Sequence, residues 1–152
     1  MMSASYAQKN QKNECSGFVS DAGYLRYTAS GYQEIINGNH SKAINESRKI
    51  ANIMAESELA KMINAAVTSV VEIMAEETGY YSEKTVDTTL VSSYNVFHEM
   101  RTICQSETKL VNNMYVTYVT KEISLEDIGD IFCKDDKNKK KELIKNIHDK
   151  EK

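Results

Sequence analysis

The strongest constraint on the fold is a helical pattern of apolar residues that runs from about Lys42 to Glu77. Apolar side chains recur there every three or four residues, and the chain of 152 residues has no Pro and only 6 Gly. Because Pro and Gly are the residues that most often end helices, their scarcity favours long helices. The stripe includes Ala43, Ile44, Ile50, Ile53, Met54, Ala60, Met62 and Ile63. We expect it to be core. A helix of about 35 residues is unusually long, so a bend or break is expected around Ala55–Glu58.

A second segment, Phe97–Tyr118, contains neither Gly nor Pro and is also predicted to be helical. At about 100° per residue, several of its side chains fall on one stripe. The stripe consists of Phe97, Met100, Cys104, Glu107, Val111, Tyr115 and Tyr118, with Arg101 on its edge. A thiol, a carboxylate one turn after it and a guanidinium one turn before it form an unusual set for a buried face.

These groups suit an open-chain tetrapyrrole (a bilin). The Cys104 thiol can form a thioether to a vinyl or ethylidene carbon, and the Arg101 cation favours the thiolate. The Glu107 carboxylate can accept hydrogen bonds from pyrrole N–H groups, while the guanidinium can bind a ligand carboxylate through two bonds. Tyr115 and Tyr118 can line an extended π system. The alternative is that Cys104 is a small hydrophobic core residue and Glu107 lies at the solvent edge.

Three runs around Cys104, namely Met100–Glu107, Tyr115–Tyr118 and Leu125–Asp127, resemble the chromophore segment of phycobiliprotein β subunits. Phycoerythrin is the most similar type. In that family a Met/Arg-containing turn leads into the chromophore Cys, and an Asp follows three residues later. Asn95 stands near the place where β subunits carry an Asn close to the same bilin.

The resemblance implies an all-α, globin-like phycobiliprotein fold, truncated at its C-terminus because the chain ends soon after Asp127. It implies one linear tetrapyrrole, phycoerythrobilin, on Cys104, attached by a bilin lyase and used in light harvesting within a phycobilisome or in light sensing. It also implies a peripheral location on the cytoplasmic side of a thylakoid of cyanobacterial type. The expected bilin-binding residues are Cys104, Glu107, Arg101, Asn95, Tyr115 and Tyr118. Loss of the last globin helices would expose apolar surface, so we expect an α-like subunit or a homo-oligomer.

We expect three parts along the chain. These are a mobile polar leader at residues 1–17, a helical bilin-binding globin-like domain at 18–133, and a charged Lys-rich tail at 134–152.

Local signals place three short elements. Ser30–Gln33 matches a capping box and predicts a short helix that ends at Gly38. Ser124–Asp127 is expected to cap a last helix. The tail is expected to be helical, because Leu143, Ile144 and Ile147 would form a small apolar patch.

The charge and the cysteine content of the chain argue against several classes of function. The formal net charge is −3, and most of the chain is acidic, which argues against nucleic acid as a partner. No apolar run is long enough for a membrane span. The 3 cysteines, Cys15, Cys104 and Cys133, are far apart and odd in number. This number and spacing predict neither a disulfide framework nor a metal-ligand pair. We therefore expect the protein to work in a reducing compartment.

No phosphate loop, nucleophile elbow or paired-His metal motif occurs, so we do not expect an enzyme. Three hypotheses follow. The first is a bilin-carrying protein. The second is a ligand-free helical protein–protein interaction module in which Cys104 is core. The third is a thiol-dependent enzyme or redox sensor that uses Cys104.

Overall fold

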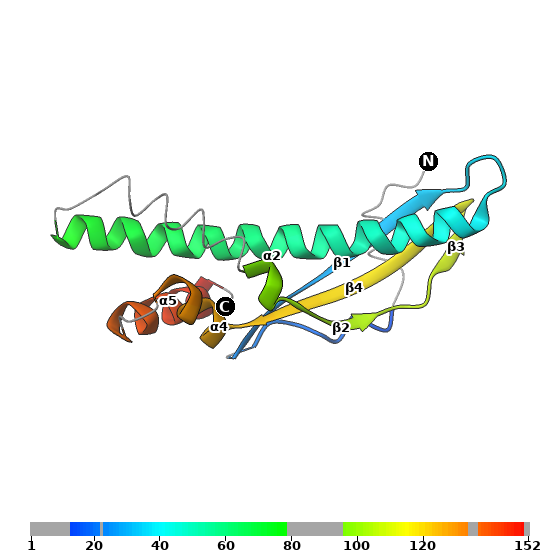
Figure 1. Ribbon diagram of the computed structural model, residues 1–152. Coiled ribbons are helices and arrows are strands. Elements are labelled where there is room, and N and C mark those ends of the chain that lie inside the picture. The colour runs from blue at the N-terminus through cyan, green and yellow to red at the C-terminus, as the bar shows by residue number, and fades with distance from the viewer. Residues whose placement is uncertain (1–12, 22, 79–95, 134–136, 151–152) are drawn as a thin grey trace. The chain divides into compact units, whose positions relative to one another are not determined.

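The structure is a computed structural model that describes residues 13–21, 23–78, 96–133 and 137–150. Its elements are β1 (Tyr24–Glu34), α2 (His40–Thr78), β2 (Arg101–Gln105), β3 (Lys109–Val111), β4 (Met114–Ser124), α4 (Leu125–Phe132) and α5 (Lys137–Lys150) (Figure 1). The strands form one four-stranded antiparallel sheet in the order β1-β4-β2, and β3 also pairs with β4. The fold is therefore mixed α/β, and the expected all-α, globin-like fold is wrong.

The chain divides into two compact units. The first consists of Met1–Val19, Arg26–Ser57 and Arg101–Glu122, and the second of Ser20–Leu25, Glu58–Met100 and Ile123–Lys152.

The predicted helix Phe97–Tyr118 is the largest error. Only residues 96–99 are helical, and the rest of the segment contains β2, β3 and the first part of β4, up to Tyr118. β4 is rich in β-branched and aromatic residues, which pack well on a pleated surface and have weaker helix propensity. Asn112 and Asn113 have φ angles of 48° and 63°. Two successive residues with positive φ make a tight hairpin turn, so the chain reverses inside the predicted helix.

The long helix was predicted correctly. α2 is continuous from His40 to Thr78, so the expected break at Ala55–Glu58 is wrong. The Asn39 side chain accepts a hydrogen bond from the Lys42 N–H at 3.1 Å, which caps the first turn. Ala43 and Ile63 of the predicted stripe are buried, whereas Ile53 and Met54 are exposed.

In the first unit, α2 packs on one face of the sheet through small side chains. The contacting cluster is Ala29, Ala51, Ala55 and Val119, and the Ser47 and Thr117 hydroxyls are 2.8 Å apart. Gly31 lies against the α2 backbone at Ser47 and Ala51. The expected helix at Ser30–Gln33 is wrong, because these residues belong to β1.

The second unit has the larger apolar core. It contains Leu25, Leu59, Ile63, Val96, Met100, Ile123, Leu125, Ile128, Leu143 and Ile147. The predicted cap is confirmed, since Ser124 Oγ accepts a hydrogen bond from the Asp127 N–H at 3.0 Å. The helical tail is confirmed as α5, whose Leu143 and Ile147 lie in this core. Of the helices that the structure describes, none has the length and apolar character needed to cross a membrane.

Candidate functional site at the Cys15–Cys104 disulfide

A β-bulge determines which residues share the sheet face opposite α2. Arg101 pairs with Glu122 and Cys104 pairs with Thr120, with a register shift between Thr102 and Cys104. Glu122 and Thr120 are two residues apart on β4, so their side chains project to the same face. The extra residue of the bulge therefore brings Arg101 and Cys104, three residues apart, onto that face together.

Cys104 forms a disulfide with Cys15, which is 89 residues away in the sequence. The Cα atoms are 5.6 Å apart, within the usual range. Cys15 is fully buried. It lies in a turn, where its backbone N–H donates a hydrogen bond to Asn13 Oδ1 at 2.8 Å. The expectation that the cysteines form no disulfide is wrong. Residues 1–12 of the predicted leader lie outside the described residues.

Ser106 and Tyr118 continue the face where β2 ends. The Ser106 N–H donates to the Tyr118 carbonyl, and the Tyr118 N–H donates to Ser106 Oγ, both at 2.8 Å. Cys15, Val116 and Tyr118 are buried together, with Tyr32 and Cys104 packed against them.

Burial raises the pKa of Tyr118 to about 12, and the neighbouring Tyr32 adds to this effect. The Tyr118 hydroxyl itself is buried, and Tyr32 is the neighbouring side chain that interacts with it.

A shallow cavity of about 180 Å³ lies beside the disulfide. It is lined by Asn13, Glu14, Ser106, Glu107, Lys109, Val116 and Tyr118. Two predicted site residues, Glu107 and Tyr118, therefore meet here. Glu107 is exposed, and it lies in the connection between β2 and β3 rather than one helical turn after Cys104.

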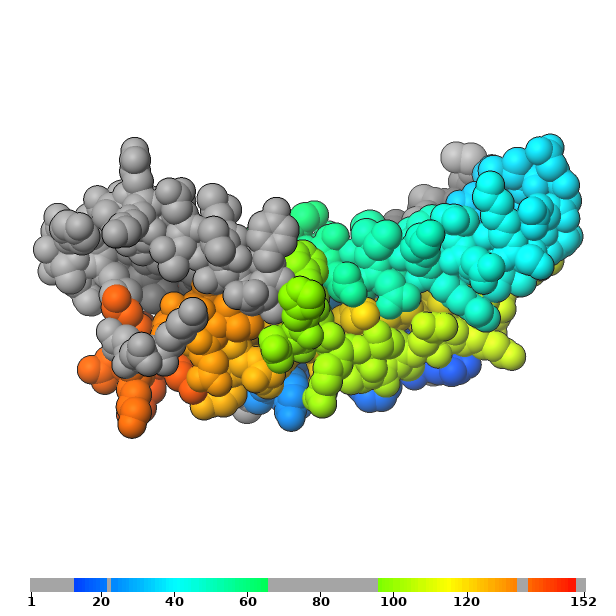
Figure 2. Space-filling model, in the orientation of Figure 1, coloured from blue at the N-terminus to red at the C-terminus, as the bar shows by residue number. Residues whose placement is uncertain are grey.

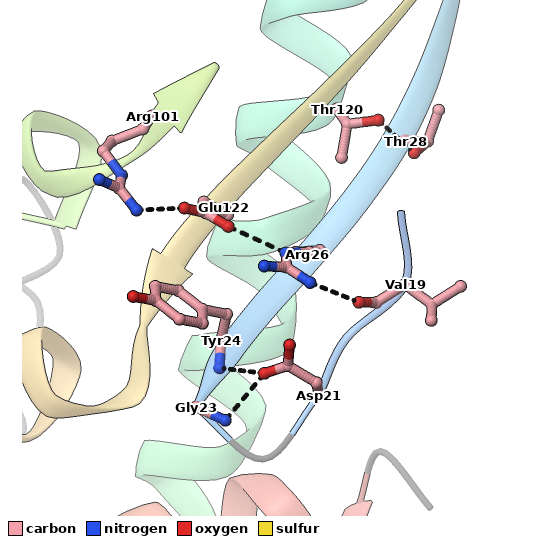
Figure 3. A network of polar contacts seen from close by, with 9 residues as sticks. All are labelled: Val19, Asp21, Gly23, Tyr24, Arg26, Thr28, Arg101, Thr120 and Glu122. Carbon is pink, nitrogen blue, oxygen red and sulfur yellow. Dashed lines mark hydrogen bonds and ion pairs between the residues drawn. The ribbon is translucent and has the colours of Figure 1, made fainter. Parts of the chain in front are cut away.

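Arg101 has a partner within the protein. Its Nη2 donates to Glu122 Oε1, and Arg26 Nε donates to Glu122 Oε2 at 2.9 Å (Figure 3). The Glu122 side chain is only 5% exposed, against 21% for Arg26 and 64% for Arg101. The Arg101 guanidinium thus neutralises a buried carboxylate of the sheet, which differs from the predicted role of binding a ligand carboxylate.

The remaining predicted residues lie elsewhere. The Tyr115 hydroxyl is 2.9 Å from His40 Nδ1 at the start of α2. Asn95 lies outside the described residues. The single helical face that would hold a bilin does not form, and the Cys104 sulfur is bonded to Cys15, so it is not available for a thioether in this state. Bilin binding stays a prediction.

Sequence reasoning missed Cys15, Ser106, Arg26 and Glu122. A signal was present for part of this set, because Tyr115–Thr120 consists entirely of aromatic and β-branched residues, a composition typical of strands. Once that segment is read as a strand, Lys121 and Glu122 are charges inside a sheet that need partners. No comparable signal pairs Cys15 with Cys104.

The described residues contain no group of three or more His, Cys, Asp or Glu side chains that could hold a metal ion. Comparisons with protein-family models, with curated proteins and with solved structures found no match. The phycobiliprotein resemblance, and the thylakoid location that rests on it, therefore remain predictions.

Proposed function

We propose that this chain is a non-catalytic assembly module that works in a disulfide-permitting compartment and associates with a second copy through the outer side of α2. The Cys15–Cys104 bond supports the compartment, because disulfides form and persist mainly in oxidising environments. This proposal keeps the interaction hypothesis drawn from the sequence and replaces its helical fold with the α/β fold.

The observation that carries the proposal is an exposed apolar strip on α2. Ile53 and Met54 are 54% and 44% exposed, and Ile50, partly buried, lies three and four residues before them. Residues at this spacing are neighbours on a helix surface. The part of α2 in the first unit is open at the surface in the space-filling view (cyan to green, Figure 2). Large contiguous apolar surfaces mark interaction sites, and we infer that this strip contributes to such a surface.

A second copy is the simplest partner for such a strip. Two-fold symmetry brings the same surface of both copies together, so one apolar strip meets its own equivalent. The residues that α2 turns toward the sheet, Ala43, Ser47, Ala51 and Ala55, are already buried within the chain. Association through Ile53 and Met54 would therefore leave the fold of the first unit unchanged.

Replacing Ile53 by glutamate is expected to convert a dimer into a monomer at micromolar concentration, because a carboxylate would lose its hydration in the interface. Sedimentation velocity over a concentration series measures this. The melting temperature should change by no more than about 2 °C, since the position is exposed.

Asn45→Glu is the matched control, because it adds the same charge at an exposed position of α2. This variant should remain dimeric. A wild-type chain that stays monomeric over the whole concentration range, or an Ile53→Glu chain that associates like wild type, would contradict the proposal.

A further inference from the structure

We propose that the segment Asn13–Val19, here named the strap, is held on the sheet by the Cys15–Cys104 disulfide, and that reduction by a dithiol releases it while the sheet stays folded. The strap would then act as a redox-controlled cover over the face formed by Val116 and Tyr118. This inference goes beyond the proposed self-association and does not depend on it.

The contacts of the strap support this assignment. Cys15 is its only buried residue among those described, and Phe18 and Val19 are 41% and 68% exposed. Most of its hydrogen bonds are internal and join Asn13 to Cys15 and Ser16, and Cys15 to Phe18.

Besides the disulfide, the packing of the Cys15 side chain against Val116 and Tyr118 and two polar contacts join the strap to the rest of the described chain. Arg26 Nη1 donates to the Val19 carbonyl at 3.2 Å (Figure 3). Cys15 Sγ lies 3.8 Å from the Tyr118 carbonyl oxygen. Burial of one thiol side chain and one exposed hydrogen bond cannot offset the conformational entropy that is lost when a whole segment is ordered. We therefore infer that the disulfide bond is what keeps the strap in place on the sheet.

Release would change the surface beside the disulfide. Asn13 and Glu14 form one wall of the cavity that Ser106 and Tyr118 also line. Without that wall the cavity becomes an open face. The Tyr118 hydroxyl, which is buried beside Tyr32 in the described structure, would become accessible to water.

The chemistry of release balances with an external dithiol as reductant. One thiolate of the dithiol attacks the sulfur of Cys104, which is partly exposed, whereas Cys15 is fully buried. The S–S bond breaks, Cys15 leaves as a thiolate and takes a proton, and a mixed disulfide forms at Cys104. The second thiol of the reductant then displaces Cys104, so two electrons pass to the protein and the reductant ends as a cyclic disulfide.

The accessibility of Cys15 after reduction tests the proposal. The full chain carrying Cys133→Ser, which removes competing disulfide exchange, is reduced with dithiothreitol in native buffer. It is then treated with excess N-ethylmaleimide, and modification of each cysteine is followed by peptide mass spectrometry. We expect Cys15 to react within about tenfold of its rate in urea, because the released strap is locally unfolded. Hydrogen exchange at Thr117–Val119 of β4 should stay slow in the same sample.

Two results would overturn the proposal. If Cys15 reacts at least about a hundredfold more slowly than in urea, the strap stays in place without the disulfide. If Cys15 reacts fast and β4 also loses its protection, the disulfide holds the whole unit and no separate strap exists. Cys104→Ser removes the disulfide without a reductant and should give the same expected result. Cys15 should react fast with N-ethylmaleimide, and hydrogen exchange in β4 should stay slow.

Discussion

Gly31→Ala is expected to lower the free energy of unfolding by about 3 kcal/mol or more. A Cβ at this position would lie 2.0 Å from the Ser47 carbonyl oxygen and 2.5 Å from the Ala51 nitrogen. Both are backbone atoms of α2, so the clash cannot be relieved by rotation of a side chain. The helix would have to move away from β1, which would loosen the contacts of Ala29 with Ala51 and Ala55. Urea denaturation followed by circular dichroism measures the loss.

Gly17→Ala is the matched control, because a Cβ there would meet no atom within 4 Å. Its stability should stay within about 0.5 kcal/mol of wild type. If Gly31→Ala were as stable as Gly17→Ala, α2 would not pack against β1 at the distance described.

Arg26→Met should lower the free energy of unfolding by about 2 kcal/mol, because it leaves the buried Glu122 carboxylate with one arginine in place of two. Removing a partner from a fully buried ion pair costs about 3–5 kcal/mol. The expected loss is smaller here, because Arg101 continues to bind Glu122 Oε1. Methionine keeps most of the apolar stem, so the change reports mainly on the charge.

Arg101→Met is the comparison variant. The Arg101 side chain is 64% exposed, so water replaces much of what it contributes, and the expected loss is below about 1 kcal/mol. The same denaturation experiment ranks the two variants. An Arg101→Met chain that loses as much stability as Arg26→Met would show that burial does not decide the strength of these two contacts.

The helices could be predicted from the sequence because their signals are local. The α2 stripe repeats over many turns, and the Ser124 cap is a contact between residues three positions apart. The sheet could not be found by the same means. From Val116 to Ile123 every residue of β4 is buried, so the strand lacks the alternation of apolar and polar residues that marks a half-exposed strand. The spacing of its apolar residues then fits a helix equally well.

The candidate site was predicted in part. Cys104 was identified as an unusual residue within its segment, and it does lie at the site. Its chemistry was misassigned because its partner, Cys15, is 89 residues away, and only the folded sheet brings the two together. Arg101 was likewise placed near Cys104, but its partner Glu122 comes from a strand that was read as helix. Contacts between distant segments depend on strand register, which residue spacing does not show.

Peptide mapping without reduction tests the Cys15–Cys104 bond directly. The protein is produced in a bacterial periplasm, its free thiols are blocked with N-ethylmaleimide, and it is digested and analysed by mass spectrometry. We expect the bond to give one cross-linked pair that joins the Cys15 peptide to the Cys104 peptide, with Cys133 blocked as a free thiol. Blocked thiols at both Cys15 and Cys104, a bond from either of them to Cys133, or a bilin adduct on Cys104 would contradict it.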